Sequence, residues 1–101
     1  MAIEIALQNE RGEILKIVHD SSNLMPKLLE RSLADQPFLA QIDWYGNTTF
    51  NRMQVPYFLS AWQTVAQRTQ NREEVKIVDE VKALAEECHN GVHLYLKFIG
   101  D

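Results

Sequence analysis

Five side chains that could do chemistry fall in one short stretch of the sequence. Residues 42–54 read IDWYGNTTFNRMQ and contain the candidates Asp43, Trp44, Tyr45, Asn51 and Arg52. A carboxylate beside aromatic rings, and a cation with an amide at the start of a helix, can hold a small ligand or support acid–base chemistry. Aromatic residues on a turn also mark surfaces that contact proteins. The stretch therefore has two functional interpretations: a pocket lined by Asp43, Tyr45, Asn51 and Arg52, or a surface that binds another protein.

A second group contains residue types that bind metals or act as nucleophiles. Cys88 and His89 are adjacent, His93 follows, and His19 lies much earlier in the chain. Their spacing matches no standard zinc pattern, and neighbouring residues of a helix point about 100° apart, so Cys88 and His89 do not share a hydrogen bond. Cys88 also continues an apolar stripe. We therefore expect a buried, unreactive thiol, no metal site, no cofactor and no catalytic residue in this group.

The composition limits the class of protein. The chain has 101 residues, of which 46% are hydrophobic and 24% charged, so we expect a single domain over residues 1–101. The net charge of −4 leaves no basic face for a phosphate backbone, which argues against nucleic acid as a partner. One cysteine, an acidic start and the lack of a long apolar run indicate a cytoplasmic protein that does not enter a membrane.

Elements that could position these residues follow from the periodicity of apolar side chains. Alternation over residues 3–8 and a turn at Gly12 predict a hairpin with residues 13–18, and residues 92–99 alternate strictly as a terminal strand. Stripes at a spacing of three and four predict helices at about 24–31, 53–68 and 71–90. Asn71 and Glu74 resemble a capping box, and Gly91 suits a helix C-terminus. Gly46 and Asn47 suggest a second, short hairpin over 42–51.

These elements predict an α+β fold with two layers. The antiparallel sheet would consist of the N-terminal hairpin and the C-terminal strand, and a helical hairpin with one short helix would cover it. Residues 33–41 carry no clear pattern. The second face of such a sheet would present Ala6, Tyr95 and Ile99, and partly apolar faces of this kind are often covered by a second copy. We therefore expect a homodimer.

Two segments resemble a known group of proteins. YGNTTFNRMQ in the middle and HLYLKFIGD at the end resemble the signatures of small uncharacterised bacterial proteins, with Y-G-[DN]-T-x-F-N-R-x-Q followed by H-x-Y-L-x-F-I-G-D. The chain carries Trp44 directly before this segment, where proline is expected in the group, and Asn47 at a position where aspartate is common. The resemblance implies a bacterial protein with a shared fold, and it supplies no catalytic residues.

The expected function is therefore a non-enzymatic interaction or adaptor protein, of the inhibitor or immunity type, that binds another protein. The alternative is a small-ligand-binding protein or enzyme that uses the pocket defined above. A structural interpretation of residues 42–54 stands beside both, in which Arg52 forms a pair with Asp101, because a half-buried guanidinium without a partner is costly.

Overall fold

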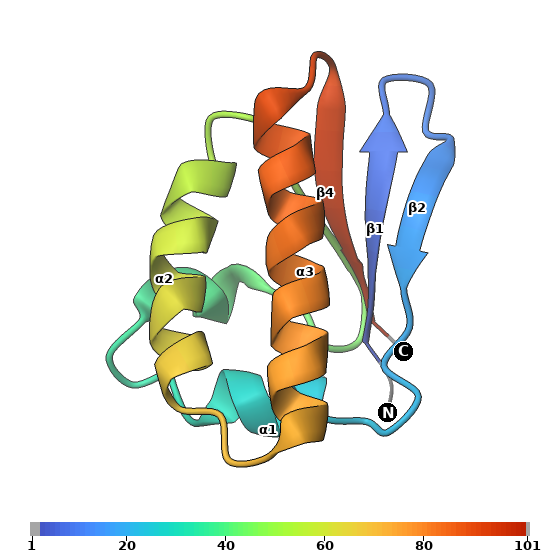
Figure 1. The fold of residues 1–101 in the computed structure, drawn as a ribbon. Coiled ribbons are helices and arrows are strands. Elements are labelled where there is room, and N and C mark those ends of the chain that lie inside the picture. The colour runs from blue at the N-terminus through green and yellow to red at the C-terminus, as the bar shows by residue number, and fades with distance from the viewer. Residues whose placement is uncertain (1–2, 101) are drawn as a thin grey trace.

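The structure, a computed structural model, describes residues 3–100 (Figure 1). The chain forms two strands, a short helix, a 3₁₀ helix, a third strand, two longer helices and a last strand. None of the described helices combines the length and the apolar character needed to cross a bilayer. The elements are β1 (Glu4–Asn9), β2 (Ile14–Val18), α1 (Met25–Glu30), η1 (Pro37–Gln41), β3 (Asn47–Phe50), α2 (Val55–Gln67), α3 (Arg72–Asn90) and β4 (Leu94–Ile99).

The four strands form one antiparallel sheet in the order β2-β1-β4-β3. The predicted N-terminal hairpin and the terminal strand are both present, and β4 lies directly beside β1 with Ile5 opposite Phe98. Helices α2 and α3 cover one face of this sheet, and α1 lies at one end of the helical layer (Figure 1). The α+β fold with a sheet packed against helices is therefore confirmed.

The predicted second hairpin over residues 42–51 is wrong. Only its second half, β3, is a strand, and β3 pairs with β4 at the far end of the chain instead of with residues 42–46. The reason is packing: Phe50 stands opposite Leu96, and its ring packs edge-on against Phe98 with 5.8 Å between ring centroids. Long-range contact between apolar side chains outweighs the local turn preference of Gly46 and Asn47.

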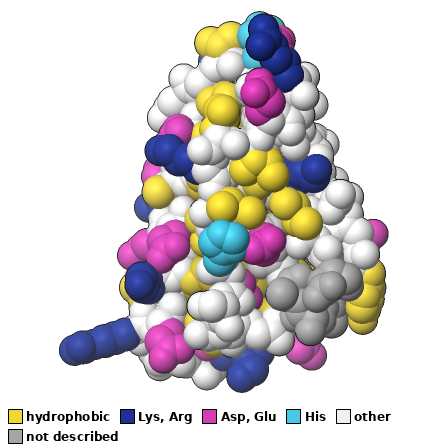
Figure 2. Space-filling view, turned by 90° about the vertical axis from the view of Figure 1, so that its right-hand side faces the viewer, with side chains coloured by type: hydrophobic (Ala, Val, Ile, Leu, Met, Phe, Trp, Pro, Cys, Tyr) yellow, Lys and Arg dark blue, Asp and Glu magenta, His cyan; other side chains and the backbone are white. Residues whose placement is uncertain are grey.

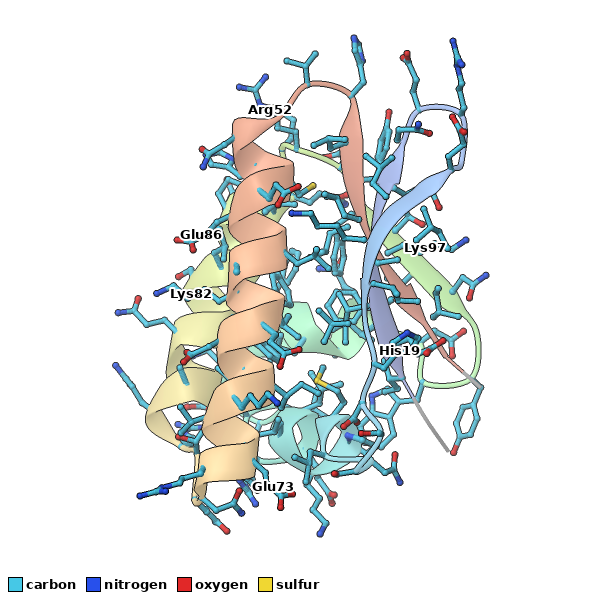
Figure 3. The ribbon with its side chains drawn as sticks, turned by 45° about the vertical axis from the view of Figure 1, so that its right-hand side comes forward. His19, Arg52, Glu73, Lys82, Glu86 and Lys97 are labelled. Atoms are coloured by element: carbon cyan, nitrogen blue, oxygen red, sulfur yellow. The ribbon has the colours of Figure 1, made fainter. Side chains whose placement is uncertain are left out.

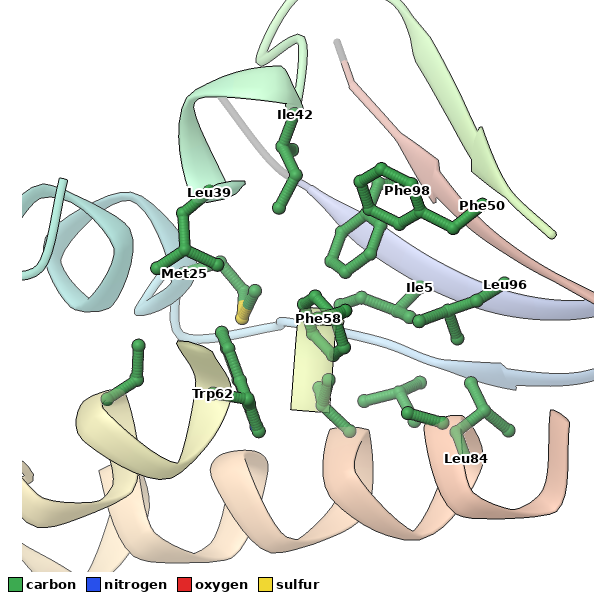
Figure 4. Packing of buried hydrophobic residues seen from close by; sticks show 14 of the residues in the cluster. Ile5, Met25, Leu39, Ile42, Phe50, Phe58, Trp62, Leu84, Leu96 and Phe98 are labelled. Atoms are coloured by element: carbon green, nitrogen blue, oxygen red, sulfur yellow. The ribbon is translucent and has the colours of Figure 1, made fainter. Parts of the chain in front are cut away.

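One hydrophobic cluster fills the space between the sheet and the helices (Figure 4). Ile3, Ile5 and Leu7 face this core as the alternation predicts. The indole nitrogen of buried Trp62 in α2 donates to the Val78 carbonyl oxygen of α3 at 3.1 Å, so the two helices are joined by a hydrogen bond inside the apolar layer. A buried tryptophan needs such a partner for its N–H.

Two local details of the helices correct the sequence-based predictions, and a third confirms one of them. Val75, expected on the apolar stripe of α3, is 44% exposed, and Glu74 is buried in its place. Asn71 does cap α3, because its side chain accepts a hydrogen bond from the Glu74 amide. Gly91 follows α3 in extended backbone and not in the left-handed conformation. A Cβ atom at this position would lie 2.2 Å from Leu94 Cδ1, so a larger residue would require the Leu94 side chain to move.

Candidate functional site

The corner before β3 is held together by its own polar groups. Asp43 Oδ1 accepts a hydrogen bond from the Tyr45 amide at 2.9 Å, and the Asp43 amide donates to Thr48 Oγ1 at 2.8 Å. An aspartate that bonds to the backbone two residues on forms a common type of turn. Trp44 is partly buried against the core, whereas Tyr45 is 73% exposed. Asp43 is therefore engaged in turn geometry, and Tyr45 is the residue of this corner that faces solvent.

The N-terminus of α2 is likewise held by hydrogen bonds between its own residues. Asn51 Oδ1 accepts hydrogen bonds from the amides of Met53 and Gln54, and Gln54 Oε1 accepts one from the Asn51 amide. These reciprocal bonds satisfy donors that a free helix N-terminus would offer to an anion. The anion-binding role that Asn51 could have served at this position is thus taken by the chain itself.

Arg52 lies at the C-terminal end of α3, beside the residues that lead into β4. Asn51, Arg52 and Met53 line a shallow hollow of about 300 Å³ together with residues 92–95. Within this hollow, His93 has a left-handed backbone with φ of 56°, which is uncommon for a residue other than glycine. Met53 and Val92 are both largely exposed at its rim. The hollow joins a cation to apolar surface, and it contains neither Asp43 nor Tyr45.

The four residues of the predicted ligand pocket are therefore not brought together. Asp43 and Tyr45 precede β3, and Asn51 and Arg52 follow it. Because β3 is extended, its length separates the two pairs. Each end of the strand combines a residue held by backbone hydrogen bonds, Asp43 or Asn51, with an exposed one, Tyr45 or Arg52.

The predicted pair between Arg52 and Asp101 cannot be followed to its end, because Asp101 lies outside the described residues. Its neighbour Gly100 donates from its amide to the Gly46 carbonyl oxygen at 2.6 Å, so the chain passes Trp44 and Gly46 beyond the last residue of β4. Arg52 instead lies beside the residues that precede β4. The pair with Asp101 stays a prediction.

The cysteine and histidines do not converge. Cys88 is buried in the core, and burial raises the pKa of its thiol to about 11, so the thiol is protonated at neutral pH. His19 contacts Glu4, and His93 Nδ1 lies 3.6 Å from Glu10 Oε2 at the other end of the sheet. Among residues 3–100, no three His, Cys, Asp or Glu side chains are grouped so that they could hold a metal ion.

Two arginines that the sequence analysis did not single out form the main polar network of the fold. Arg31 donates two hydrogen bonds to the buried carboxylate of Glu74, at 2.7 and 3.0 Å. Arg68 donates to both oxygens of Asp35 and to the Arg31 carbonyl oxygen. Hydrogen bonds from Arg31 are the main cause that lowers the pKa of Glu74, and Arg68 lowers the pKa of Asp35 in the same way. The sequence contained a sign that Glu74 is buried, because Glu74 precedes Val78 by one helical turn on the apolar stripe of α3.

The face of the sheet opposite the helices is covered by no described element (Figure 1). The register places Ala6 on this face between Ile17 and Lys97, and Lys97 also stands opposite Thr49. The His19 imidazole contacts the Glu4 carboxylate at one end of this face. Figure 2 shows hydrophobic side chains gathered along the middle of this side of the molecule, with acidic and histidine side chains beside them.

Strand β2, at the border of that face, is the most apolar exposed element of the chain. Among residues 3–100, three of the eight exposed large hydrophobic side chains belong to this one strand of five residues. They are Ile14, Leu15 and Ile17, with exposed fractions of 49%, 51% and 36%. The opposite edge strand, β3, is shorter and presents Asn47 and Thr49 to solvent.

Comparison with known proteins gives no match to this chain among family models, curated proteins or solved structures. The resemblance to a group of small bacterial proteins therefore stays a prediction, and the function must be argued from the surfaces described above.

Proposed function

We propose that this chain is a small cytoplasmic interaction protein, without catalytic activity, that binds another protein through the uncovered face of its sheet. The observation that carries this proposal is the unequal cover of the sheet, with helices on one face and no described element on the other (Figure 1). An exposed mixture of apolar side chains with an aromatic residue and a few charges is typical of surfaces that bind proteins reversibly.

The charges on this face indicate the chemistry of the partner. Lys97 lies in the middle of β4, between Ala6 and Thr49, and points away from the helices (Figure 3). The hydrophobic side chains gathered on this side of the molecule favour a partner with an apolar patch, and the ammonium group of Lys97 favours a carboxylate placed opposite (Figure 2). Charge complementarity of this kind sets register and specificity more than affinity.

The small-ligand alternative receives less support from the same structure. The oxygen atoms of Asp43 and Asn51 that would bind a ligand accept backbone hydrogen bonds, and the four pocket residues lie at two ends of β3. A thermal-shift screen separates the two functions, because a ligand pocket would give saturable stabilisation by a small molecule.

The test of the interaction is a matched pair of charge reversals. Lys97→Glu changes the uncovered face, and Lys82→Glu makes the same change on the helical side of the molecule (Figure 3). Protein captured from a lysate of the source organism by the wild type and by Lys82→Glu would be identified, purified and titrated against all three chains. We expect Lys97→Glu to weaken binding at least tenfold, about 1.4 kcal/mol, and a partner carboxylate changed to lysine to restore it.

If Lys97→Glu and the wild type bind the partner equally well, the uncovered face is not the binding surface. Failure of the wild type to retain any protein from its own source would contradict the proposed function as a whole.

A further inference from the structure

We infer that the groove between α2 and α3, on the side of the helical layer that faces away from the sheet, binds an amphipathic helix of a partner protein. This surface is separate from the uncovered face of the sheet, so the inference goes beyond the proposed function and does not depend on it. The groove has a volume of about 430 Å³. The residues that line its walls include Leu59, Ser60, Gln63 and Ala66 of α2, with Lys82 and Glu86 of α3.

Helix α2 forms the wall of this groove that carries no charge. Its sequence, VPYFLSAWQTVAQ, contains no acidic or basic residue, although Ser60, Gln63 and Ala66 are exposed on it. Most exposed positions of α3 carry a charged side chain instead. Tyr57 of α2 is 69% exposed beside the same surface. Depletion of charge together with an exposed aromatic ring is typical of the centre of a protein interface, so α2 has the composition of a helix that a partner covers.

The backbone around the groove favours a helix as the occupant. Both walls are α-helices, whose N–H and C=O groups bond within the helix and offer no open edge to an extended peptide. A helix satisfies its own backbone groups and needs only a stripe of apolar side chains to fill a groove. The lining residues of α2 extend from Pro56 to Ala66, about 15 Å along the axis, which is the length of about three turns of a second helix.

The α3 wall determines the charges that such a helix needs. Lys82 and Glu86 both line the groove and lie one helical turn apart, so a cation and an anion follow each other along this wall (Figure 3). Among residues 3–100, the ion pairs join other side chains, and neither of these two takes part in one. A helix with an acid and a base one turn apart on one edge, and uncharged residues on the edge that meets α2, complements both walls.

A second copy of this chain fits the groove less well than another protein does. Helices α2 and α3 bury their apolar stripes against the sheet, as at Phe58 and Trp62 in α2 and at Val81 and Leu84 in α3. Helix α1 has only six residues. None of the helices within residues 3–100 therefore has a full apolar stripe left for the groove of a neighbour.

The probe is a display library in which one exposed helix of a stable helical bundle is varied, because short helices are marginal when free. Its apolar stripe varies among leucine, isoleucine, methionine and phenylalanine, and its other positions among glutamate, lysine, glutamine and alanine. Selection against the wild type should yield helices with an acid and a base one turn apart on one edge. Binding should shift the NMR signal of the Trp62 indole, which lines the groove, and leave that of Trp44 unchanged.

Two alanine substitutions locate the contact. Ala66→Lys puts a charge into the uncharged wall and should weaken binding of the selected helix at least tenfold. Ala83→Lys makes the same change at an exposed alanine of α3 that does not line the groove, and binding should be unchanged. Lysine is a good helix former, so both variants should fold, and circular dichroism checks this.

Two charge reversals test the complementarity and separate it from the proposed function. Lys82→Glu should weaken binding at least tenfold, and exchange of the acid of the selected helix for lysine should restore it. Lys97→Glu, on the uncovered face of the sheet, should leave binding of this helix unchanged.

The inference is overturned if no selected helix binds with a dissociation constant below about 100 μM. It is also overturned if the selected helix binds Ala66→Lys as tightly as the wild type. A wild-type mass of twice 11.7 kDa that Ala66→Lys returns to that of one chain would identify a second copy as the occupant, against the inference.

Discussion

The arginines at the two ends of helix α3 are held in opposite ways. At its N-terminal end, Arg31 and Arg68 are each bound to a carboxylate, and Glu74 is buried between them and the core. At its C-terminal end, Arg52 and His93 line a shallow hollow beside the exposed side chains of Met53 and Val92. The first end is therefore fixed by bonds within the chain, and the second is largely solvent-exposed.

This difference shows that residue type alone does not predict whether a charged side chain stabilises the fold or is exposed and free to bind a partner. Arg52 was the arginine expected to form a structural pair, yet the arginine that forms two hydrogen bonds to a buried carboxylate is Arg31. A cation stabilises a fold mainly where it satisfies a group that is already removed from water.

The largest effect is expected when the buried end loses its carboxylate. Glu74→Ala should lower the free energy of unfolding by about 2–4 kcal/mol, because Arg31 loses both of its acceptors and the Gln70 amide loses one. Urea denaturation measures this loss. Glu73→Ala, at an exposed neighbouring position, is the control and should change stability by less than about 0.5 kcal/mol. Equal effects of the two changes would show that Glu74 is no more structural than a surface residue.

Acid should weaken the same end of the molecule. The pKa of Glu74 is lowered in the folded state, chiefly by hydrogen bonds from Arg31, so its contribution to stability is present above its ordinary value of 4.5. That contribution is lost as the pH falls through the lower folded pKa. Urea midpoints measured from neutral to acid pH should therefore converge for the wild type and Glu74→Gln. A difference that stays constant with pH would contradict the lowered pKa.

Near the C-terminal end of α3, replacement of His93 by glycine should be slightly stabilising. His93 has φ of 56°, and glycine adopts this conformation without steric cost, so His93→Gly should gain about 0.5 kcal/mol after the entropy of the unfolded chain is counted. Thermal unfolding measures the gain. Asn23→Gly, where φ is 55°, is the matched backbone control. A clear loss of stability in His93→Gly alone would indicate that the imidazole makes contacts the fold needs.

The smallest effect is expected at Arg52. Arg52→Ala should change stability by less than about 0.5 kcal/mol, as for other exposed side chains without a buried partner. The same change in a chain that lacks Asp101 tests the predicted pair, because an Arg52 that acts independently gives the same loss in both chains. If Arg52→Ala lowers the free energy of unfolding by more than about 1 kcal/mol, and this loss disappears when Asp101 is removed, the pair exists. The two ends of α3 would then be more alike than the comparison above states.

Secondary-structure elements could be predicted from the sequence where apolar side chains recur at a regular spacing. Strict alternation in the terminal strand and the stripes at Phe58 and Trp62 in α2, or Val81 and Leu84 in α3, predicted elements that the structure confirms. Periodicity reports burial of a face, and burial dominates the energy of these elements.

Long-range partners are the part that single-sequence patterns did not supply. The segment before β3 was read as half of a local hairpin because Gly46 and Asn47 favour a turn, but the choice of β4 as partner depends on Phe98, almost fifty residues later. Arg31 and Glu74 are likewise separated by 43 positions. The position of Glu74 on the buried stripe indicated that its carboxylate needs a partner, but no local pattern named Arg31 as that partner or β4 as the partner of β3.

The central place of β4 in the sheet also determines the order in which the molecule can assemble. Glu4, at the start of the first strand, pairs with Ile99 of the last, and β3 has no strand beside it except β4. A chain emerging from the ribosome can close the first hairpin and both long helices early, but it cannot complete the sheet until residues 94–99 have been released. Until then the backbone groups of β1 that pair with β4 have no partner strand, and the apolar faces of the helices are only partly covered by the sheet. Folding should therefore be slow for a chain of this length, since the closure of its longest loop comes last.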